Sequence, residues 1–266
     1  MSPAPESVRF ATWNVNSIRS RTDAVLDWIE RRQPDVLLLQ ETKCRDEALP
    51  ILDLESRGYA LAHHGIDHWN GVAIVSRVGL DDVSAGFRVG GEPHYPEARI
   101  ISATCAGVRV HSLYVPNGRE LDDPHYLYKL EWLARLRTEL AAELATGSRV
   151  LAAGDFNVAP TDLDIYDPRR WRRQTHASPP ERSAVDALIR LGLCDVVRDR
   201  DPSAGLYTWW SYRPGQFEAN RGLRIDLALL DPLLAQRVTG AWVDRDERGR
   251  IRPSDHAPVV VDVAAP

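Results

Sequence analysis

The sequence predicts a four-layer α/β sandwich, in which two packed mixed β-sheets are flanked by helices. Short apolar runs typical of strands outnumber helical patterns by roughly two to one along the chain. Many of these runs follow one another without a helix between them, which excludes a regular alternation of strand and helix. With 266 residues and 44% hydrophobic content, the chain can bury a large core. We expect a disordered lead-in at residues 1–7 and a single domain at residues 8–266.

Three helices are expected. The first covers residues 22–32 and ends before Pro34, because the residue that precedes a proline disfavours helical dihedrals. The second begins after Asp123, an N-cap residue followed by Pro124 at the first helical position. Its buried stripe consists of leucines at helical spacing: Leu130, Leu133, Leu136, Leu140 and Leu144. A third, short helix is expected at residues 184–191.

The remaining apolar runs are rich in β-branched or aromatic residues and predict strands. Two of them, on either side of Ala106-Gly107, should form a hairpin. The polar, proline-containing residues 160–180 predict a long loop. The expected strands are residues 8–15, 35–42, 59–64, 71–77, 98–104, 108–115, 150–157, 207–212, 224–230, 239–244 and 259–263.

Charge and cysteine content exclude several classes of protein. The 33 basic and 38 acidic residues give a net charge of −5, which argues against a general polyanion binder but allows a local basic face. Cys44, Cys105 and Cys194 are scattered, so neither a disulfide framework nor a thiolate zinc site is expected, and Cys44 is expected to be inert. No signal-peptide core or transmembrane run is present in the sequence. We expect a soluble cytoplasmic protein without a membrane partner.

The stretch RVLAAGDFNVAP, residues 149–160, is the most informative in the chain. Its apolar run is expected to break at Gly154, and Asp155 and Asn157 follow two residues apart. At that spacing both side chains can point the same way if the strand direction persists. A carboxylate at the end of a strand is costly to bury unless a cation or a hydrogen bond meets it. The alternative is a plain strand followed by an Asx turn.

Polar side chains also occur in or at the ends of other expected strands. Carboxylate and amide oxygens are the ligands that Mg²⁺ and Mn²⁺ prefer, and no His- or Cys-rich cluster indicates zinc. A single imidazole beside such a set suits the hydrolysis of a phosphate ester. Carboxylates that merely cap turns remain the alternative at this point. The set comprises Asn14, Glu41, Tyr114, Asn117, Asp155, Asn157, Asp226, Asp255 and His256.

Six motifs now identify a family resemblance. TWNVNSIR, QETK, YVPNGR, GDFNVAPTDLD, NRGLRIDLAL and SDHAPV stand in the order found in the exonuclease III group of abasic-site endonucleases. That group belongs to the endonuclease/exonuclease/phosphatase superfamily, and the resemblance implies the fold of deoxyribonuclease I. It extends from about Phe10 to about Val263. YVPNGR and NRGLRIDLAL narrow it to the DNA-repair branch.

The resemblance implies a site for Mg²⁺, with Mn²⁺ as an alternative cation. Glu41 is then the principal ligand, helped by Asn14 and Asp255. Asp155 and Asn157 would belong to a second metal site, if one exists.

The resemblance also implies the catalytic roles. His256 lies against the scissile phosphate, and Asp226 orients its imidazole. Asp155 activates water or protonates the leaving 3′ oxygen, while Asn157 and Tyr114 hold the phosphate. The division of proton transfer between Asp155 and His256 stays open.

Substrate choice is expected to come from Trp209, Leu223 and Ile225. In the family these positions line a small apolar pocket that admits a flipped-out sugar without its base. Residues 169–173, RRWRR, are the densest basic cluster; a solvated loop is favoured over a DNA contact with Trp171 stacking. The other expected DNA contacts are Asn16, Lys43, Asn117, Arg119, Asn220 and Arg221.

The resemblance therefore implies a Mg²⁺-dependent phosphodiesterase that cleaves 5′ to abasic sites in duplex DNA. It further implies 3′→5′ exonuclease and 3′-phosphatase activity, with duplexes carrying abasic sites or blocked 3′ ends as partners and a monomeric enzyme. One alternative is an enzyme of the same fold that hydrolyses RNA or an inositol phosphate. Another is a DNA-binding protein that has lost catalysis, which the complete set of site residues disfavours.

Overall fold

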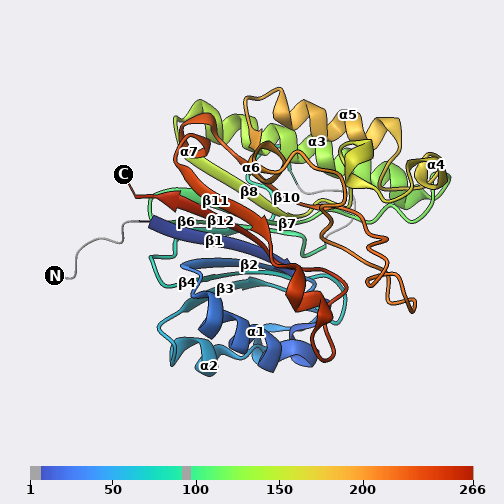
Figure 1. The fold of residues 1–266 in the computed structure, drawn as a ribbon. Coiled ribbons are helices and arrows are strands. Elements are labelled where there is room, and N and C mark those ends of the chain that lie inside the picture. The colour runs from blue at the N-terminus through green and yellow to red at the C-terminus, as the bar shows by residue number, and fades with distance from the viewer. Residues whose placement is uncertain (1–6, 92–96, 266) are drawn as a thin grey trace.

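The protein consists of two six-stranded sheets packed face to face, with helices on both outer faces (Figure 1). The structure is a computed structural model, and it describes residues 7–91 and 97–265. The expected four-layer sandwich of two mixed sheets is confirmed. Residues 1–6 of the expected disordered lead-in lie outside the described residues, whereas Ser7 already belongs to the first strand.

The first sheet has the strand order β11-β12-β1-β2-β4-β3. Its strands β1 and β2 run parallel, and the other neighbours are antiparallel. The carboxyl ends of β1 and β2 therefore meet at one edge. The bounds are β1 Ser7–Asn14, β2 Val36–Gln40, β3 Ala60–His64, β4 Val72–Ser76, β11 Val238–Val243 and β12 Val259–Ala264.

The second sheet has the order β5-β6-β7-β8-β10-β9 and repeats this design. Here β7 and β8 are the parallel pair, and the expected hairpin is β6–β7. The bounds are β5 Asp81–Ala85, β6 Ile100–Cys105, β7 Val108–Tyr114, β8 Arg149–Asp155, β9 Cys194–Asp195 and β10 Asp226–Leu230.

Alternation along the strands divides the apolar side chains between an inter-sheet core and two outer layers. In β1, Phe10 packs between the sheets, while Trp13 packs with Trp28 of α1 (Ile18–Arg32) on the outer face. On the second sheet, α3 (Pro124–Ala145) and α5 (Pro179–Ile189) bury Trp132 and Leu188 against the outer face. Each sheet is thus held rigidly from both sides.

The helices lie outside the two sheets or in the loops around them (Figure 1). No helix within the described ranges is long and apolar enough to cross a membrane. The α-helices are α1 Ile18–Arg32, α2 Ile51–Glu55, α3 Pro124–Ala145, α4 Pro168–Trp171, α5 Pro179–Ile189, α6 Val196–Arg200 and α7 Pro232–Ala235; short 3₁₀ turns are η1 Asp46–Ala48, η2 Asp162–Asp164 and η3 Arg245–Gly249.

Several expectations about local structure are wrong. Residues 207–212 do not form a strand: within the described chain, Trp209 makes only isolated bridges to Leu223 and His256. Residues 160–180 are not one loop, since they contain η2 and α4 and the start of α5. The expected strand at 150–157 ends two residues earlier, at Asp155. Gly154 lies within it, where a Cβ would lie 2.0 Å from the Leu113 carbonyl oxygen.

The helical stripe of α3 is broader than the leucine pattern indicated. Leu133, Leu136 and Leu140 are buried as expected, whereas Leu130 and Leu144 are only half-buried. The helix also buries Lys129, a charged residue in line with the leucines. This lysine reaches the loops of the site described below.

Candidate active site

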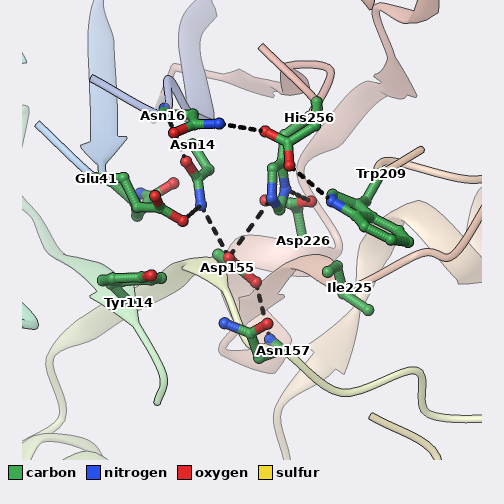
Figure 2. A network of polar contacts seen from close by, with 12 residues as sticks. Asn14, Asn16, Glu41, Tyr114, Asp155, Asn157, Trp209, Ile225, Asp226 and His256 are labelled. Carbon is green, nitrogen blue, oxygen red and sulfur yellow. Dashed lines mark hydrogen bonds and ion pairs between the residues drawn. The ribbon is translucent and has the colours of Figure 1, made fainter. Parts of the chain in front are cut away.

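The candidate site lies where the central strands of both sheets end. Asn14 is the last residue of β1, and Glu41 directly follows β2. From the other sheet, Tyr114 and Asp155 are the last residues of β7 and β8, which pair in register. Asp226, the first residue of antiparallel β10, stands opposite Asp155. Side chains from distant parts of the chain therefore converge on one point, as Figure 2 shows.

His256 is fixed between two carboxylates. Its Nδ1 lies 2.8 Å from Oδ2 of Asp226, and its Nε2 lies 3.8 Å from Oδ2 of Asp155. All three side chains are nearly inaccessible to solvent. The expectation that Asp226 orients the imidazole therefore has the geometry that it needs.

Burial and charge shift the pKa of both partners. Burial raises the pKa of Asp155, and the nearby charges of Asp226 and Glu41 raise it further, whereas His256 opposes them. Burial alone would lower the pKa of His256, but Asp226 and Asp155 outweigh it and raise that pKa. Because two carboxylates stand opposite each other on neighbouring strands, the site can hold a proton that isolated carboxylates would release.

Three groups of this site surround a point where a cation could lie. Ligand atoms of Glu41, Asp155 and His256 all lie within 4.8 Å of one another, and the two carboxylates are the oxygen ligands among them. Oδ1 of Asp226, nearby, is buried without a hydrogen-bond partner among the described residues. This excess of oxygen acceptors over donors fits a hard divalent cation.

The other two expected ligands are arranged differently. Asn14 presents its Nδ2 amide to Glu41 at 2.8 Å and to Asp155 at 2.9 Å, so it bridges the two carboxylates. Asp255 accepts hydrogen bonds from Asn16 and from Nε1 of Trp209, both at 3.0 Å. The group of three described above does not include Asp255.

The loop after β2 holds Glu41 in an unusual conformation. Glu41 and Lys43 have φ angles of 53° and 51°, in the left-handed region that costs non-glycine residues about 1–2 kcal/mol each. Between them, buried Thr42 contacts Nε2 of His63 at 2.8 Å, and Nδ1 of His63 contacts Asp46 at 2.6 Å. This supporting chain has no signal in the sequence, because its members are separated along it.

Lys43 lies in the site as a positive charge. Its ammonium group is 2.6 Å from Oε2 of Glu41 and donates to Oδ1 of Asn16 at 2.7 Å. Tyr114 faces the same carboxylate: burial raises the pKa of its hydroxyl, and the charge of Glu41 adds to the increase. Tyr114 therefore keeps its proton and can donate it in a hydrogen bond.

Asn157 is held from behind by a buried ion pair that sequence reasoning missed. The side-chain Nδ2 of Asn157 donates to the Val115 carbonyl at 2.9 Å, and the backbone carbonyl of Asn157 accepts from Nζ of Lys129 at 2.6 Å. Lys129 forms a salt bridge with Glu181, and both side chains are fully buried. The clue was present, since Lys129 falls on the helical stripe of Leu133 and Leu136.

The same network supports Asn117. Its backbone carbonyl accepts from Lys129 at 3.2 Å, and its Nδ2 donates to Oδ1 of Asn157 at 3.3 Å. Glu181 accepts from the backbone N–H of His176. The Thr175 hydroxyl lies 2.9 Å from the Asn117 carbonyl and 2.8 Å from Oε1 of Glu181, and it donates its single proton to one of the two. The two asparagine loops are therefore fixed by one set of buried charges.

The three expected pocket residues adjoin one another. Leu223 and Ile225 belong to an apolar cluster with Ile165, and Trp209 packs against it from a half-buried position. Leu223 is completely buried, so it supports the pocket rather than facing its opening.

Three of the expected DNA contacts outside the pocket, Arg119, Asn220 and Arg221, differ in their surroundings. Arg119 and Arg221 are exposed. By contrast, the side chain of Asn220 accepts from Nε1 of Trp210 at 3.1 Å and donates to the Gly205 carbonyl at 2.9 Å. Asn220 therefore has a clear role in holding its own loop.

Comparisons with known proteins agree with the motifs. The family model described as "Endonuclease/Exonuclease/phosphatase family" matches residues 11–256. Exodeoxyribonuclease III of Haemophilus influenzae is 34% identical over 264 residues, which covers 95% of this chain and 98% of that protein. The structure of a 3′-5′ exonuclease from Neisseria meningitidis superposes with a TM-score of 0.93 at 39% identity, covering 97% of this chain and all of the other. An AP endonuclease from Archaeoglobus fulgidus gives 0.91 at 37% identity, covering 96% and 98%. The chain therefore belongs to the endonuclease/exonuclease/phosphatase family.

Proposed function

We propose that this protein is a Mg²⁺-dependent DNA-repair phosphodiesterase, with Mn²⁺ as an alternative cation. It cleaves duplex DNA on the 5′ side of abasic sites and removes nucleotides and phosphate from 3′ ends. The single observation that carries the proposal is the convergence of Glu41, Asp155 and His256 on one point from both sheets. The names of its relatives, which include an exodeoxyribonuclease, a 3′-5′ exonuclease and an AP endonuclease, support the choice of DNA.

The cation would be held chiefly by Glu41, with Asp155 next to it, and would neutralise charge on the phosphate oxygens. Asn14 and Asp255 remain further candidates for its ligands; Asn14 would have to present its amide oxygen. If a second cation binds, we propose that Asp155 and Asn157 hold it. Other divalent ions differ in size and geometry, so their relative activity is a direct test of this assignment.

The residues around the cation site have separate catalytic roles in this proposal. His256, oriented and charged by Asp226, donates from Nε2 to a phosphate oxygen, and Asn157 and Tyr114 donate to other oxygens of the group. Asp155 accepts a proton from the attacking water as the bond from phosphorus to the 3′ oxygen breaks. The departing 3′ oxygen takes up a proton from solvent water and becomes the 3′-hydroxyl.

Substrate binding is assigned to the exposed surface around this centre. Trp209, Leu223 and Ile225 form and support the pocket for the abasic sugar. The DNA contacts are assigned to Asn16, Lys43, Asn117, Arg119 and Arg221.

The compartment and the oligomeric state are also part of the proposal. Among the described residues, Cys44, Cys105 and Cys194 are free thiols, which supports a cytoplasmic enzyme. We propose that the enzyme acts as a monomer.

A cleavage assay with three substrates tests the proposal. The substrates are a duplex with one tetrahydrofuran abasic analogue, a nicked duplex with a 3′-phosphate, and a soluble phosphomonoester, each with Mg²⁺ and with chelator. We expect metal-dependent cutting 5′ to the analogue and release of the 3′-phosphate. Hydrolysis of the soluble ester without action on either duplex would overturn the assignment to DNA. Tight binding without metal-dependent cleavage would indicate a protein that has lost catalysis.

A further inference from the structure

Part of the basic cluster at residues 169–173 lines a hollow of the structure. The cluster is therefore more than the solvated loop that the sequence predicted. Arg170 and Trp171, at the end of α4, line a hollow of about 250 Å³. Trp209 and Arg221 line the same hollow. Segments roughly forty to fifty residues apart in sequence therefore meet at one depression.

This hollow shares a wall with the candidate active site. Nε1 of Trp209 donates to Asp255 at 3.0 Å, and the backbone of Trp209 bridges to His256. Figure 2 shows Trp209 beside Ile225 and Asp226 at the edge of the catalytic group. A strand bound with its phosphate at His256 would meet this hollow next.

The charge of the hollow is exclusively positive, although the whole chain carries −5. Arg170, Arg213 and Arg221 line it, and no aspartate or glutamate does. The three guanidinium groups belong to exposed residues, and none has a carboxylate within 4.0 Å in the described part of the chain. A neighbouring hollow that contains Arg173 differs, because Glu120 and Asp122 also line it. Unpaired arginines can bind backbone phosphates, and aromatic walls can stack against bases or sugars. The hollow is therefore suited to binding DNA.

The two tryptophans pack against the same apolar support. Trp171 and Trp209 both contact the cluster that contains Ile165, Leu223 and Ile225. Nε1 of Trp171 is buried and has no hydrogen-bond partner among the described residues, so this indole contributes its ring rather than a polar contact. Two tryptophans therefore stand on one apolar support beside the hollow, and the family resemblance pointed only to Trp209.

We propose that this hollow is a DNA subsite, in which Arg170, Arg213 and Arg221 bind backbone phosphates next to the scissile one and Trp171 forms the second wall of the pocket. The proposal rests on the proposed DNA substrate. It assigns a role to Arg170 and Trp171 but none to Arg172, which lines a different hollow with Asp162 and Arg182.

Arg172 provides a matched control within the same short segment. Binding of a fluorescent duplex with a tetrahydrofuran analogue is measured by anisotropy in chelator, so that cleavage does not interfere. We expect Arg170→Ala to raise Kd by about fivefold or more and to reduce the salt slope by about 0.9, the value for one lost phosphate contact. Arg172→Ala should stay within about twofold of the parent. Equal effects of the two changes would overturn the subsite, because a diffuse basic surface treats both arginines alike.

The wall is tested with Trp171→Ala and Trp171→Phe. Loss of a stacked ring costs on the order of 1–3 kcal/mol, so Trp171→Ala should lower kcat/KM on the analogue by about fivefold or more. Trp171→Phe loses no hydrogen bond and should keep most of the activity; it also remains informative if the alanine variant fails to fold. A folded Trp171→Ala with unchanged kcat/KM would overturn the wall, as would a phenylalanine variant as impaired as the alanine one. If the parent protein cuts the duplex while these results fail, only the subsite is wrong; if the parent neither binds nor cuts it, the proposed function is wrong.

Discussion

Two lysines of the site form ion pairs with glutamates, yet they have opposite surroundings. On the side of the first sheet, Lys43 contacts Glu41 with 28% and 15% of the side chains exposed. On the side of the second sheet, Lys129 and Glu181 have no exposed surface. Glu41 and Lys43 can separate, so that the carboxylate binds a cation and the ammonium group binds a substrate phosphate. Lys129 and Glu181 cannot separate without leaving an unpaired buried charge.

The difference extends to the residues that each pair supports. Glu41 and Lys43 belong to a loop in left-handed conformation, and their carboxylate and ammonium groups meet at the mouth of the site. Lys129 instead holds the carbonyls of Asn117 and Asn157 behind the catalytic group. We infer that one half of the site exchanges ligands while the other half stays preorganised.

The largest expected effect comes from the imidazole of His256, which Asp226 of the second sheet holds in place. His256→Asn should lower kcat by about 10²–10⁴, because the group facing the phosphate is lost while Asp226 keeps its buried position. The concentration of Mg²⁺ at half-maximal activity should change far less. Single-turnover cleavage across a Mg²⁺ titration separates the two quantities. A loss of less than about tenfold would remove His256 from the centre of the reaction.

The buried ion pair of Lys129 and Glu181 should contribute mainly to the stability of the fold. Lys129→Met leaves Glu181 buried without its partner, so we expect the free energy of unfolding to fall by about 3–5 kcal/mol. The pKa of Glu181, which Lys129 and its hydrogen bonds hold below the usual value against burial, should rise in this variant. Urea denaturation provides the measurement.

A second variant distinguishes a lost ion pair from a simple packing defect. Combining Lys129→Met with Glu181→Gln removes the unpaired charge and should restore part of the lost stability. Lys43→Met removes the partly exposed ion pair with Glu41 and should leave the unfolding free energy within about 1 kcal/mol of the parent. Equal destabilisation by Lys129→Met and Lys43→Met would refute the contrast between the two pairs.

The exchangeable half should respond through metal affinity. Glu41→Gln removes the charge of the principal ligand but keeps its shape. We expect Mg²⁺ affinity to fall by at least the roughly 10–100-fold that is typical when a partner of a metal ligand is lost. Titration calorimetry with Mn²⁺ measures the affinity directly, and cleavage at rising Mg²⁺ should recover much of the rate. The fold should persist, because Glu41 is partly exposed and its loop is also held by Thr42. Unchanged affinity would contradict the ligand assignment.

The sequence predicted the carboxylates at the strand ends better than it predicted the buried ion pair. Asp155 is the last residue of one buried apolar strand and Glu41 directly follows another, so simple patterns placed both at strand ends, and the sheet topology brings them together. Lys129 was missed because a charged residue on a leucine stripe breaks the expected binary pattern, and its partner lies 52 residues away. Buried charge pairs depend on tertiary packing that local patterns do not contain.

The errors in secondary structure have local causes. The edge strand β5, DDVSA, is polar and mostly exposed, so it lacks an apolar signal. The start of α5 was assigned to a loop because of Pro179 and Pro180, although Ser178 and Glu181 form a capping box that marks a helix start. Residues 207–212 have the aromatic composition of a strand, but they run beside Leu223 and His256 with only isolated bridges.

The smallest expected effect concerns the lysine that competes with the cation. Lys43 lies 2.6 Å from Glu41, so a cation that binds there must displace its ammonium group. A partly exposed pair of this kind contributes about 1 kcal/mol, and Lys43→Met should therefore raise Mn²⁺ affinity by about two- to fivefold. The same variant should bind DNA more weakly, since Lys43 is also expected to contact a phosphate. Calorimetry without DNA isolates the first effect. A decrease in Mn²⁺ affinity would show that Lys43 orders the loop of Glu41 instead of competing for its carboxylate, and the contrast with Lys129 would then be one of degree.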